Sequence, residues 1–367
     1  MIIQNGWVFE SDKTFSKRDL YIKNGVFSDT ADELTDTTVI DAEGCFVLPG
    51  LIDVHSHGAC GHDFSDADVK GMKQILAYEY AHGITSYCPA SMTVSREKLL
   101  HIYKTASLLH PSAKEASIAG FHMEGPFIDK EKKGAQKENH ILSPDVSFFR
   151  TCNELSCHKI KLVTISPKAP DALSFIRELH DEVTISLGHT TADYACVKNA
   201  FQAGASHVTH LFNAMPPLSH RSPGLIGAAA ETDNCYAELI CDGIHVHESM
   251  IRAAFKLFPN RIVLISDSMR ATGMPDGCYE LGEQNVIVKG KTATMEDGTI
   301  AGSVTNLYDC MLTAMSYGIP ATEAIAAATI NPAKSIGIFD TVGSLDTGKK
   351  ANLLLVDKNY QLLRVIS

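Results

Sequence analysis

The sequence lacks the features that usually mark membrane, secreted and nucleic-acid-binding proteins. No segment reaches about 18 uninterrupted apolar residues, and the opening MIIQNGWVFE has no basic leader before a long apolar core, so we expect neither membrane insertion nor secretion. Positive charge is scarce, because 32 Lys and Arg accompany 43 Asp and Glu, a net charge of -11. Nucleic acids and anionic membranes select basic surfaces, which argues against both as partners. We expect a cytoplasmic protein.

Cysteine motifs and repeats are also missing. The ten cysteines are scattered, with no C-x-x-C among them, so we expect mostly small buried thiols and no disulfide framework. No internal repeat or low-complexity tract occurs. What remains is ordinary globular composition over 367 residues, 45% hydrophobic and 20% charged. This length suits one large α/β domain and a smaller one.

Both ends of the chain are rich in short β-strand patterns. Before residue 50, alternating segments are separated by Asn-Gly, Gly and acidic turns, which predicts antiparallel strands of a small sheet. The stretch 340–367 resumes this pattern. We therefore predict a small β-sandwich domain built from residues 1–50 plus 340–367, and a separate domain over 51–339.

The middle of the chain alternates strand and helix patterns. Strand candidates begin at residues 51, 84, 118, 161, 184, 207, 237 and 262. Helix candidates such as 68–83 and 192–205 lie between them, and 285–303 resembles an inserted hairpin. Eightfold alternation is typical of a (β/α)8 TIM-type barrel, although a doubly wound open sheet also alternates. Polar residues at the end of nearly every strand favour the barrel, whose active sites lie at the carboxyl ends of its strands.

Two histidines end the first barrel strand. His55 and His57 are two residues apart, so they share one face of the strand and can converge on one metal ion. Such a pair is also compatible with hydrogen-bonded core histidines. Further ligand-type residues favour the metal site, with Glu124 and His189 ending the third and fifth strands and His210 lying on the sixth. A divalent cation held there could activate water.

Each of these residues also has a structural interpretation when taken alone. Glu124 could cap a turn, His189 could begin a helix and His210 could pack in the core. Asp267, after the eighth strand, could be a helix N-cap. It could equally accept the proton of an attacking water and return it to a leaving amine, as amide hydrolysis requires. Recurrence at one rim favours the chemical interpretation for all of them.

The residues lie in motifs that resemble the amidohydrolase superfamily, and within it the N-acetylglucosamine-6-phosphate deacetylases. The matching motifs are PGLIDVHSHG, GFHMEGPF, SLGHTTADY, THLFNAMPPLSHRSPGLIG, CDGIHVH, LISDSM and NPAK. The resemblance implies one or two divalent ions, zinc or iron. Its implied metal ligands are Glu124, His189 and His210, with His55 and His57 for a second ion, and its implied catalytic residue is Asp267. Glu124 is the candidate for bridging the two ions. Other amidohydrolases carbamylate a lysine at the end of the fourth strand, and this chain has no lysine there.

The resemblance also implies a site for a sugar phosphate. Asn213 and Ala214 would contact it, and Arg221 and His245 would bind its phosphate, with Arg221 reaching the neighbouring site of a homodimer. Several family members carry a histidine where this chain has Gln136. An amide can still donate a hydrogen bond to the substrate carbonyl, without a positive charge.

The predicted reaction is hydrolysis of the acetamide of N-acetylglucosamine 6-phosphate to glucosamine 6-phosphate and acetate. Alternatives are the same reaction on N-acetylgalactosamine 6-phosphate, hydrolysis of another amide by a different amidohydrolase, and a catalytically silent metal-binding barrel. Retention of Asp267 together with every ligand argues against the silent barrel, because simple binding needs no acid/base group.

Overall fold

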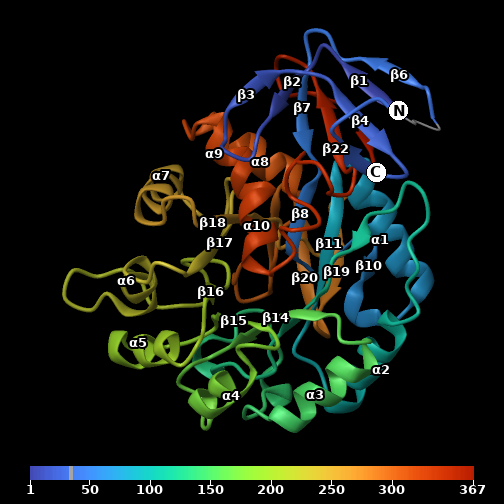
Figure 1. Ribbon diagram of the computed structural model, residues 1–367. Helices are drawn as coiled ribbons and strands as arrows, with labels where there is room; N and C mark the ends of the chain where they lie inside the picture. The colour runs from blue at the N-terminus through green and yellow to red at the C-terminus, as the bar shows by residue number, and fades with distance from the viewer. Residues whose placement is uncertain (33–35) are drawn as a thin grey trace.

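The fold is a large barrel with a small β domain set on one end. The computed structural model describes residues 1–32 and 36–367. The barrel occupies most of the molecule, and both chain ends lie in the small domain at the top of Figure 1. Among the described residues, no helix is long and apolar enough to cross a membrane.

Among the described residues, eight parallel strand positions form the wall of the barrel. The strands are β8 (Leu51–Ser56), β11 (Ile84–Ser91), β12 (Ser117–Ile118) with β13 (Phe121–Glu124), β14 (Ile160–Ile165), β15 (Thr184–Leu187), β16 (His207–Val208), β17 (Tyr236–Ile240) and β18 (Ile262–Ile265). They pair in chain order from β8 to β18. The ring is completed where Asp267 N donates to His55 O at 2.9 Å and His57 N donates to Ser268 O at 2.7 Å. This confirms the predicted barrel over the open sheet.

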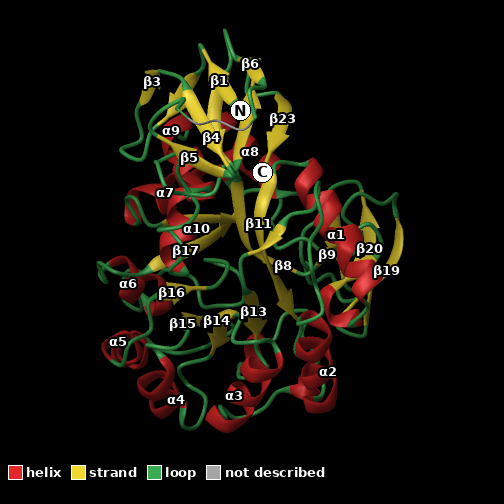
Figure 2. Ribbon diagram, turned by 45° about the vertical axis from the view of Figure 1, so that its right-hand side comes forward, coloured by secondary structure: helices red, strands yellow, loops and turns green. Residues whose placement is uncertain are grey.

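Helices cover the outside of the barrel (Figure 2). They are α1 (Val69–Ala81), α2 (Arg96–Ala106), α3 (Val146–Leu155), α4 (Ala172–Leu179), α5 (Tyr194–Gln202), α6 (Gly224–Ala230), α7 (Glu248–Leu257), α8 (Leu307–Ser316), α9 (Ala321–Ala328) and α10 (Ile330–Ser335). Several begin at a side chain that accepts a hydrogen bond from the first turn, such as Asp68 for α1 and Asp193 for α5. Both helices lie within the predicted ranges.

Apolar side chains fill the barrel interior below the strand ends. Ile52, Val54, Leu162 and Ile265 belong to one buried cluster there. These residues come from three strands that are far apart in the sequence, so the barrel has a packed floor and no open channel.

The small domain contains two sheets. One has the order β5 (Val26–Ser28), β4 (Leu20–Lys23), β1 (Ile2–Gln4), β6 (Val39–Asp41), and the other β23 (Leu362–Ile366), β22 (Leu353–Val356), β7 (Phe46–Pro49), β2 (Trp7–Phe9), β3 (Phe15–Lys17). Its core joins the two chain ends, with Ile3 and Val47 packed among Leu345 and Leu353. The boundaries near residues 50 and 340 stay a prediction.

Three sequence-based expectations need correction. The β1–β6 and β2–β7 ladders are parallel, because intervening strands return the chain to its original direction. The insertion after β18 is a three-stranded sheet of β19 (Gly277–Leu281), β20 (Gln284–Lys289) and β21 (Thr292–Thr294), so the hairpin prediction missed its first strand. The sixth barrel strand ends at Val208, and His210 therefore follows that strand instead of lying on it.

Candidate metal centre and active site

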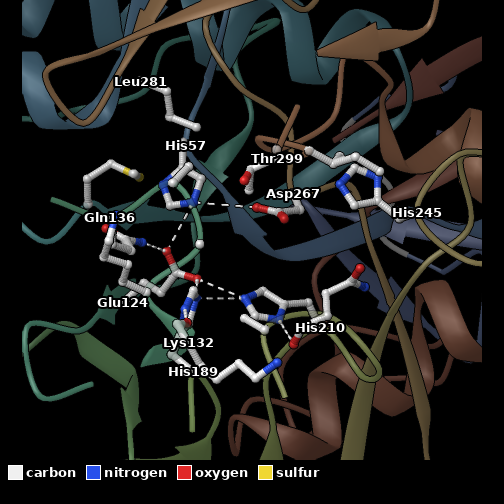
Figure 3. Close-up of a pocket in the computed structure, with 18 of the residues that line it drawn as sticks. His57, Glu124, Lys132, Gln136, His189, His210, His245, Asp267, Leu281 and Thr299 are labelled. Carbon is white, nitrogen blue, oxygen red and sulfur yellow. Dashed lines mark hydrogen bonds and ion pairs between the residues drawn. The ribbon is translucent and has the colours of Figure 1, made fainter. Parts of the chain in front are cut away.

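A polar cavity of about 480 Å³ opens at the carboxyl ends of the barrel strands. Figure 3 shows side chains from several strand ends pointing into it. The lining includes the predicted residues His57, Glu124, Gln136, His189, His210, Asn213, Ala214, His245 and Asp267. His55 lies directly beneath, completely buried. Arg221 is the one predicted site residue that lies away from the cavity. It is exposed on the surface loop before α6.

Glu124, His189 and His210 form one compact set of ligand atoms. Glu124 Oε1 lies 3.1 Å from His189 Nε2 and 3.2 Å from His210 Nε2, and the two ring nitrogens are 3.0 Å apart. Ligands of a tetrahedral zinc ion are about 3.3 to 3.6 Å apart, given bond lengths of about 2.0 to 2.2 Å. The spacing of this set is therefore close to that of a coordination shell.

The outer nitrogens of both rings are engaged by backbone carbonyls. His189 Nδ1 donates to Lys132 O at 2.7 Å, and His210 Nδ1 donates to Asn213 O at 3.2 Å. A neutral imidazole with a proton on Nδ1 carries a lone pair on Nε2. Two lone pairs and a carboxylate oxygen thus face one another, and these electron-rich atoms repel. A cation between them would remove the repulsion. Carbonyl acceptors of this kind commonly orient metal-binding histidines.

His55, His57 and Asp267 form a second set beside the first. Asp267 Oδ1 lies 3.7 Å from His55 Nε2 and 3.5 Å from His57 Nε2. His57 Nδ1 donates to Ala90 O at 3.1 Å, and His55 Nε2 is buried with no hydrogen-bond partner. An orphaned buried nitrogen beside a carboxylate also fits a cation site.

Glu124 lies between the two sets. Its Oε1 is 3.4 Å from His55 Nε2, and its Oε2 is 3.3 Å from His57 Nε2. Burial raises the pKa of Glu124, but His55 and the neighbouring imidazoles of His189 and His210 hold that pKa well below its ordinary range. One ionised carboxylate therefore faces both sets: its Oε1 lies near members of each, and its Oε2 reaches His57.

The second set attracts positive charge strongly. Burial lowers the pKa of His57, yet its contacts with Asp267 and Glu124 raise that pKa to about 10. Burial raises the pKa of Asp267, but His57 and His55 lower it below its ordinary value. Asp267 is therefore ionised at neutral pH, the state that a proton acceptor requires.

Three of these residues have a left-handed backbone. The φ angles are 47° at His189, 28° at His210 and 47° at Asp267. Such values are rare outside glycine and cost free energy that the surrounding structure must offset. For Asp267, Ser303 N supplies a fixing hydrogen bond to its carbonyl at 2.7 Å. The strand ends are thus bent so that these side chains turn into the cavity.

Gln136 reaches Glu124 from the loop after β13. Its Oε1 accepts from Thr93 N at 2.7 Å, and its Nε2 donates to Glu124 Oε2 (Figure 3). The loop carrying it is tied to the inserted sheet, where Glu283 accepts from Lys137 Nζ at 2.7 Å. The Gln136 amide is buried, so its direction is fixed.

The far side of the cavity carries His245 and a strand-six loop. His245 Nδ1 donates to Asp242 Oδ2 at 2.7 Å, which leaves Nε2 free to face a ligand. Burial raises the pKa of Asp242, but the bond from His245 lowers it below its ordinary value. Asn213 and Ala214 line the cavity next to His210, and Ala214 is left-handed with φ 51°.

A group of basic residues in this cavity was not predicted from the sequence. Lys130, Lys132 and Lys133 line the same cavity from the short 3-10 turn Lys130–Lys132 and the residue after it. The run KEKK was the available signal, but nothing in its spacing indicated where the loop would fold. Residues 297–302 after β21 were also missed, and Asp297, Thr299 and Ile300 line the opposite wall.

Comparison with known proteins agrees with this geometry. A model of the amidohydrolase family matches residues 46–366. The chain belongs to the amidohydrolase family. This amidohydrolase is therefore a metal-dependent hydrolase of a carbon–nitrogen bond, and the resemblance predicted from its motifs is confirmed.

Relatives with curated names cover most of this amidohydrolase. It is 38% identical over 327 residues to N-acetylglucosamine-6-phosphate deacetylase from Bacillus subtilis (strain 168), a match that covers 87% of this chain and 83% of that protein. It is 32% identical to the enzyme of the same name from Lysinibacillus sphaericus, over 100% and 96% of the two chains.

Solved structures show the same likeness. A deacetylase variant from Mycobacterium smegmatis in complex with N-acetyl-D-glucosamine-6-phosphate superposes with a TM-score of 0.92 at 29% identity, covering 100% of this chain and 97% of that one. N-acetylglucosamine-6-phosphate deacetylase from Pasteurella multocida gives a TM-score of 0.90 at 26% identity, with the same coverage.

Proposed function

We propose that this amidohydrolase removes acetyl from N-acetylglucosamine 6-phosphate, giving glucosamine 6-phosphate and acetate. The observation that carries the proposal is the convergence of two ligand sets on Glu124, with the ionised Asp267 at the same cavity. Several curated relatives bear the name of this activity over most of their length, which supports the choice of substrate.

The proposed metal ligands are the residues of the two sets other than Asp267. Glu124, His189 and His210 would hold one divalent ion, and His55 and His57 would hold a second that shares Glu124. Imidazole and carboxylate ligands accept both zinc and iron, so we propose one or two ions of either metal per subunit. When bound, such an ion lowers the pKa of water and polarises the amide carbonyl.

Asp267 and Gln136 are proposed to act on the reacting atoms. Asp267 accepts a proton from the attacking water, and later gives that proton to the departing amine as the carbon–nitrogen bond breaks. Gln136 uses one amide hydrogen on Glu124, and its second hydrogen is proposed to donate to the developing oxyanion. The oxygen of the attacking water becomes part of acetate, and its proton passes through Asp267 to the free amine.

The phosphate is proposed to bind away from Glu124. Lys130, Lys132 and Lys133 supply positive hydrogen-bond donors at the rim, which an anion requires in a chain of net charge -11, and His245 is proposed to contact the same phosphate. Arg221 is proposed to enter the site of a second subunit, because it is exposed on the surface of its own chain. The nearby apolar side chain of Leu218 is 42% exposed, and a subunit contact would cover it. This arrangement makes a homodimer the proposed functional unit.

We also propose that the enzyme works in the cytoplasm. All ten cysteines, each within the described part of the chain, are unpaired, which suits a reducing compartment. Five of them are fully buried, so the expectation that most are buried thiols holds for half.

The decisive experiment measures acetate release from a panel of N-acetylhexosamine 6-phosphates with protein of known metal content. We expect turnover of the glucosamine compound, with the galactosamine epimer and the unphosphorylated sugar as comparisons. Equal rates with and without the phosphate would reject the proposed anion site. Loss of all turnover in fully metallated protein would favour a different amide or a silent barrel.

A further inference from the structure

Glu238, on β17, is a fully buried carboxylate beneath the cavity that the proposed reaction does not use. Its Oε2 accepts from His55 Nδ1 at 2.8 Å and from His210 N at 3.0 Å. The same oxygen therefore contacts the side chain of one ligand set and the backbone of the other.

The contact with His55 sets which ring nitrogen faces the cavity. Because the Glu238 oxygen is an acceptor, the proton of the imidazole lies on Nδ1, and Nε2 keeps its lone pair. That Nε2 is the orphaned atom 3.4 Å from Glu124 Oε1 and 3.7 Å from Asp267 Oδ1. A carboxylate behind a histidine in this way is a common means of orienting a metal ligand.

The contact with His210 holds an unusual backbone. The φ angle at His210 is 28°, and because β16 ends at Val208, the buried N–H of His210 lies beyond the backbone ladder of that strand and needs another acceptor. Glu238 Oε2 accepts that N–H, and the Glu238 carbonyl accepts from Leu211 N at 2.8 Å. Both ends of this residue thus fix the segment that carries His210.

Glu238 could in principle be a metal ligand itself, because it lies with His55 and His122 in a cluster of suitable atoms. Its Oε2 already accepts from two N–H groups, those of His55 Nδ1 and His210 N, whereas the His55 nitrogen that faces Glu124 is Nε2. The geometry therefore makes this contact a hydrogen bond and places Glu238 outside the coordination shell.

We propose that Glu238 is a positioning residue that ties His55 to His210 and so sets the spacing at which Glu124 serves both ligand sets. The inference rests on the proposed metal site. Its consequence is that cation affinity depends on the reach of the side chain at this position as well as on its charge.

Two variants separate reach from charge. Glu238→Asp keeps the charge but withdraws the oxygen by one methylene, whereas Glu238→Gln keeps the reach and loses the charge. We expect Glu238→Asp to weaken Zn²⁺ binding about 10- to 100-fold, and Glu238→Gln to weaken it less. Glu79→Asp is the matched control, because Glu79 is equally buried on α1 and contacts neither ligand set.

The measurement is Zn²⁺ titration of metal-free protein with metal analysis, made only on variants whose circular dichroism matches wild type. A double-mutant cycle with His55→Ala adds a readout that a general packing defect would not change: the two losses should be less than additive. A Glu238→Gln loss larger than the Glu238→Asp loss, or fully additive losses, would overturn the inference. Failure of the proposed reaction is distinguished by wild-type protein that binds Zn²⁺ fully and releases no acetate.

Discussion

The Nε2 atoms of His189 and His210 lie 3.0 Å apart, while the Nδ1 of each ring donates to a backbone carbonyl. Neither ring can therefore donate to the other unless it takes up an extra proton. The lone pairs of the two Nε2 atoms therefore repel, and positive charge between them removes this repulsion. Removal of a metal ion from this position should lower the stability of the fold as well as the activity.

Metal removal gives the first prediction. Dialysis against a chelator should abolish acetate release and lower the melting temperature, and added Zn²⁺ should restore both. A ligand present at about 1,000 times its Kd stabilises the folded state by about 4 kcal/mol, an effect that differential scanning calorimetry resolves. An unchanged melting temperature after verified metal loss would contradict the assignment of these ligand sets.

Replacement of Asp267 by asparagine is the second test. The amide cannot accept the proton of water, so Asp267→Asn should reduce kcat about 10²- to 10⁴-fold. Glu124, His189 and His210 are untouched, and metal analysis should find the first ion retained. A variant with wild-type kcat would reject Asp267 as the acid/base group.

The third prediction concerns Gln136. Gln136→Leu removes the amide that contacts Glu124 and the proposed oxyanion, and loss of one oxyanion donor typically costs about 10²- to 10³-fold in kcat. The loss should appear in kcat more than in KM. If metal content falls in step with activity, the amide would instead be acting only as a support for Glu124.

Arg221 provides a test of the dimer. Arg221→Ala should raise KM for the sugar phosphate and leave it unchanged for an unphosphorylated acetamide. Mixing unfolded Arg221→Ala and Asp267→Asn proteins and refolding them together should recover activity, because hybrid dimers contain one complete site. Absence of recovery, with hybrid formation verified by mass spectrometry, would mean that Arg221 does not cross between subunits.

Asp145 gives a stability prediction away from the cavity. Burial raises its pKa, but hydrogen bonds led by Phe148 N lower that pKa to about 2, and its side chain caps α3. The folded-state pKa is depressed, so this stabilisation is complete above pH 4 and disappears as the pH falls from about 4 to about 2. Asp145→Ala should therefore cost about 1 kcal/mol at pH 7 in urea unfolding, with unchanged kcat. A difference from wild type that stayed constant down to pH 2 would contradict the cap.

The sequence predicts the barrel and most of the cavity because both depend on local patterns. A buried strand ending in a polar residue, as at Glu124 or Asp267, shows its direction and its chemistry within a few letters. Glu238 was missed because its role arises from a contact across the barrel. Lys132 was missed because its loop has no periodicity, and its position depends on the hydrogen bond that its carbonyl accepts from His189 Nδ1.

The seam of the barrel has a consequence for how the protein is made. Ser266 Oγ donates a hydrogen bond to Asp53, 213 residues away in the chain. Next to this contact, Asp267 N donates to the His55 carbonyl and so completes the ring. A ribosome-bound chain holds Glu124, His189 and His210 well before residue 267 is synthesised. Such a chain could assemble the first ligand set, but the second comes into existence only with the last strand. Long-range closure of this kind is slow, so full loading of the proposed metal sites would be a late reporter of completed folding.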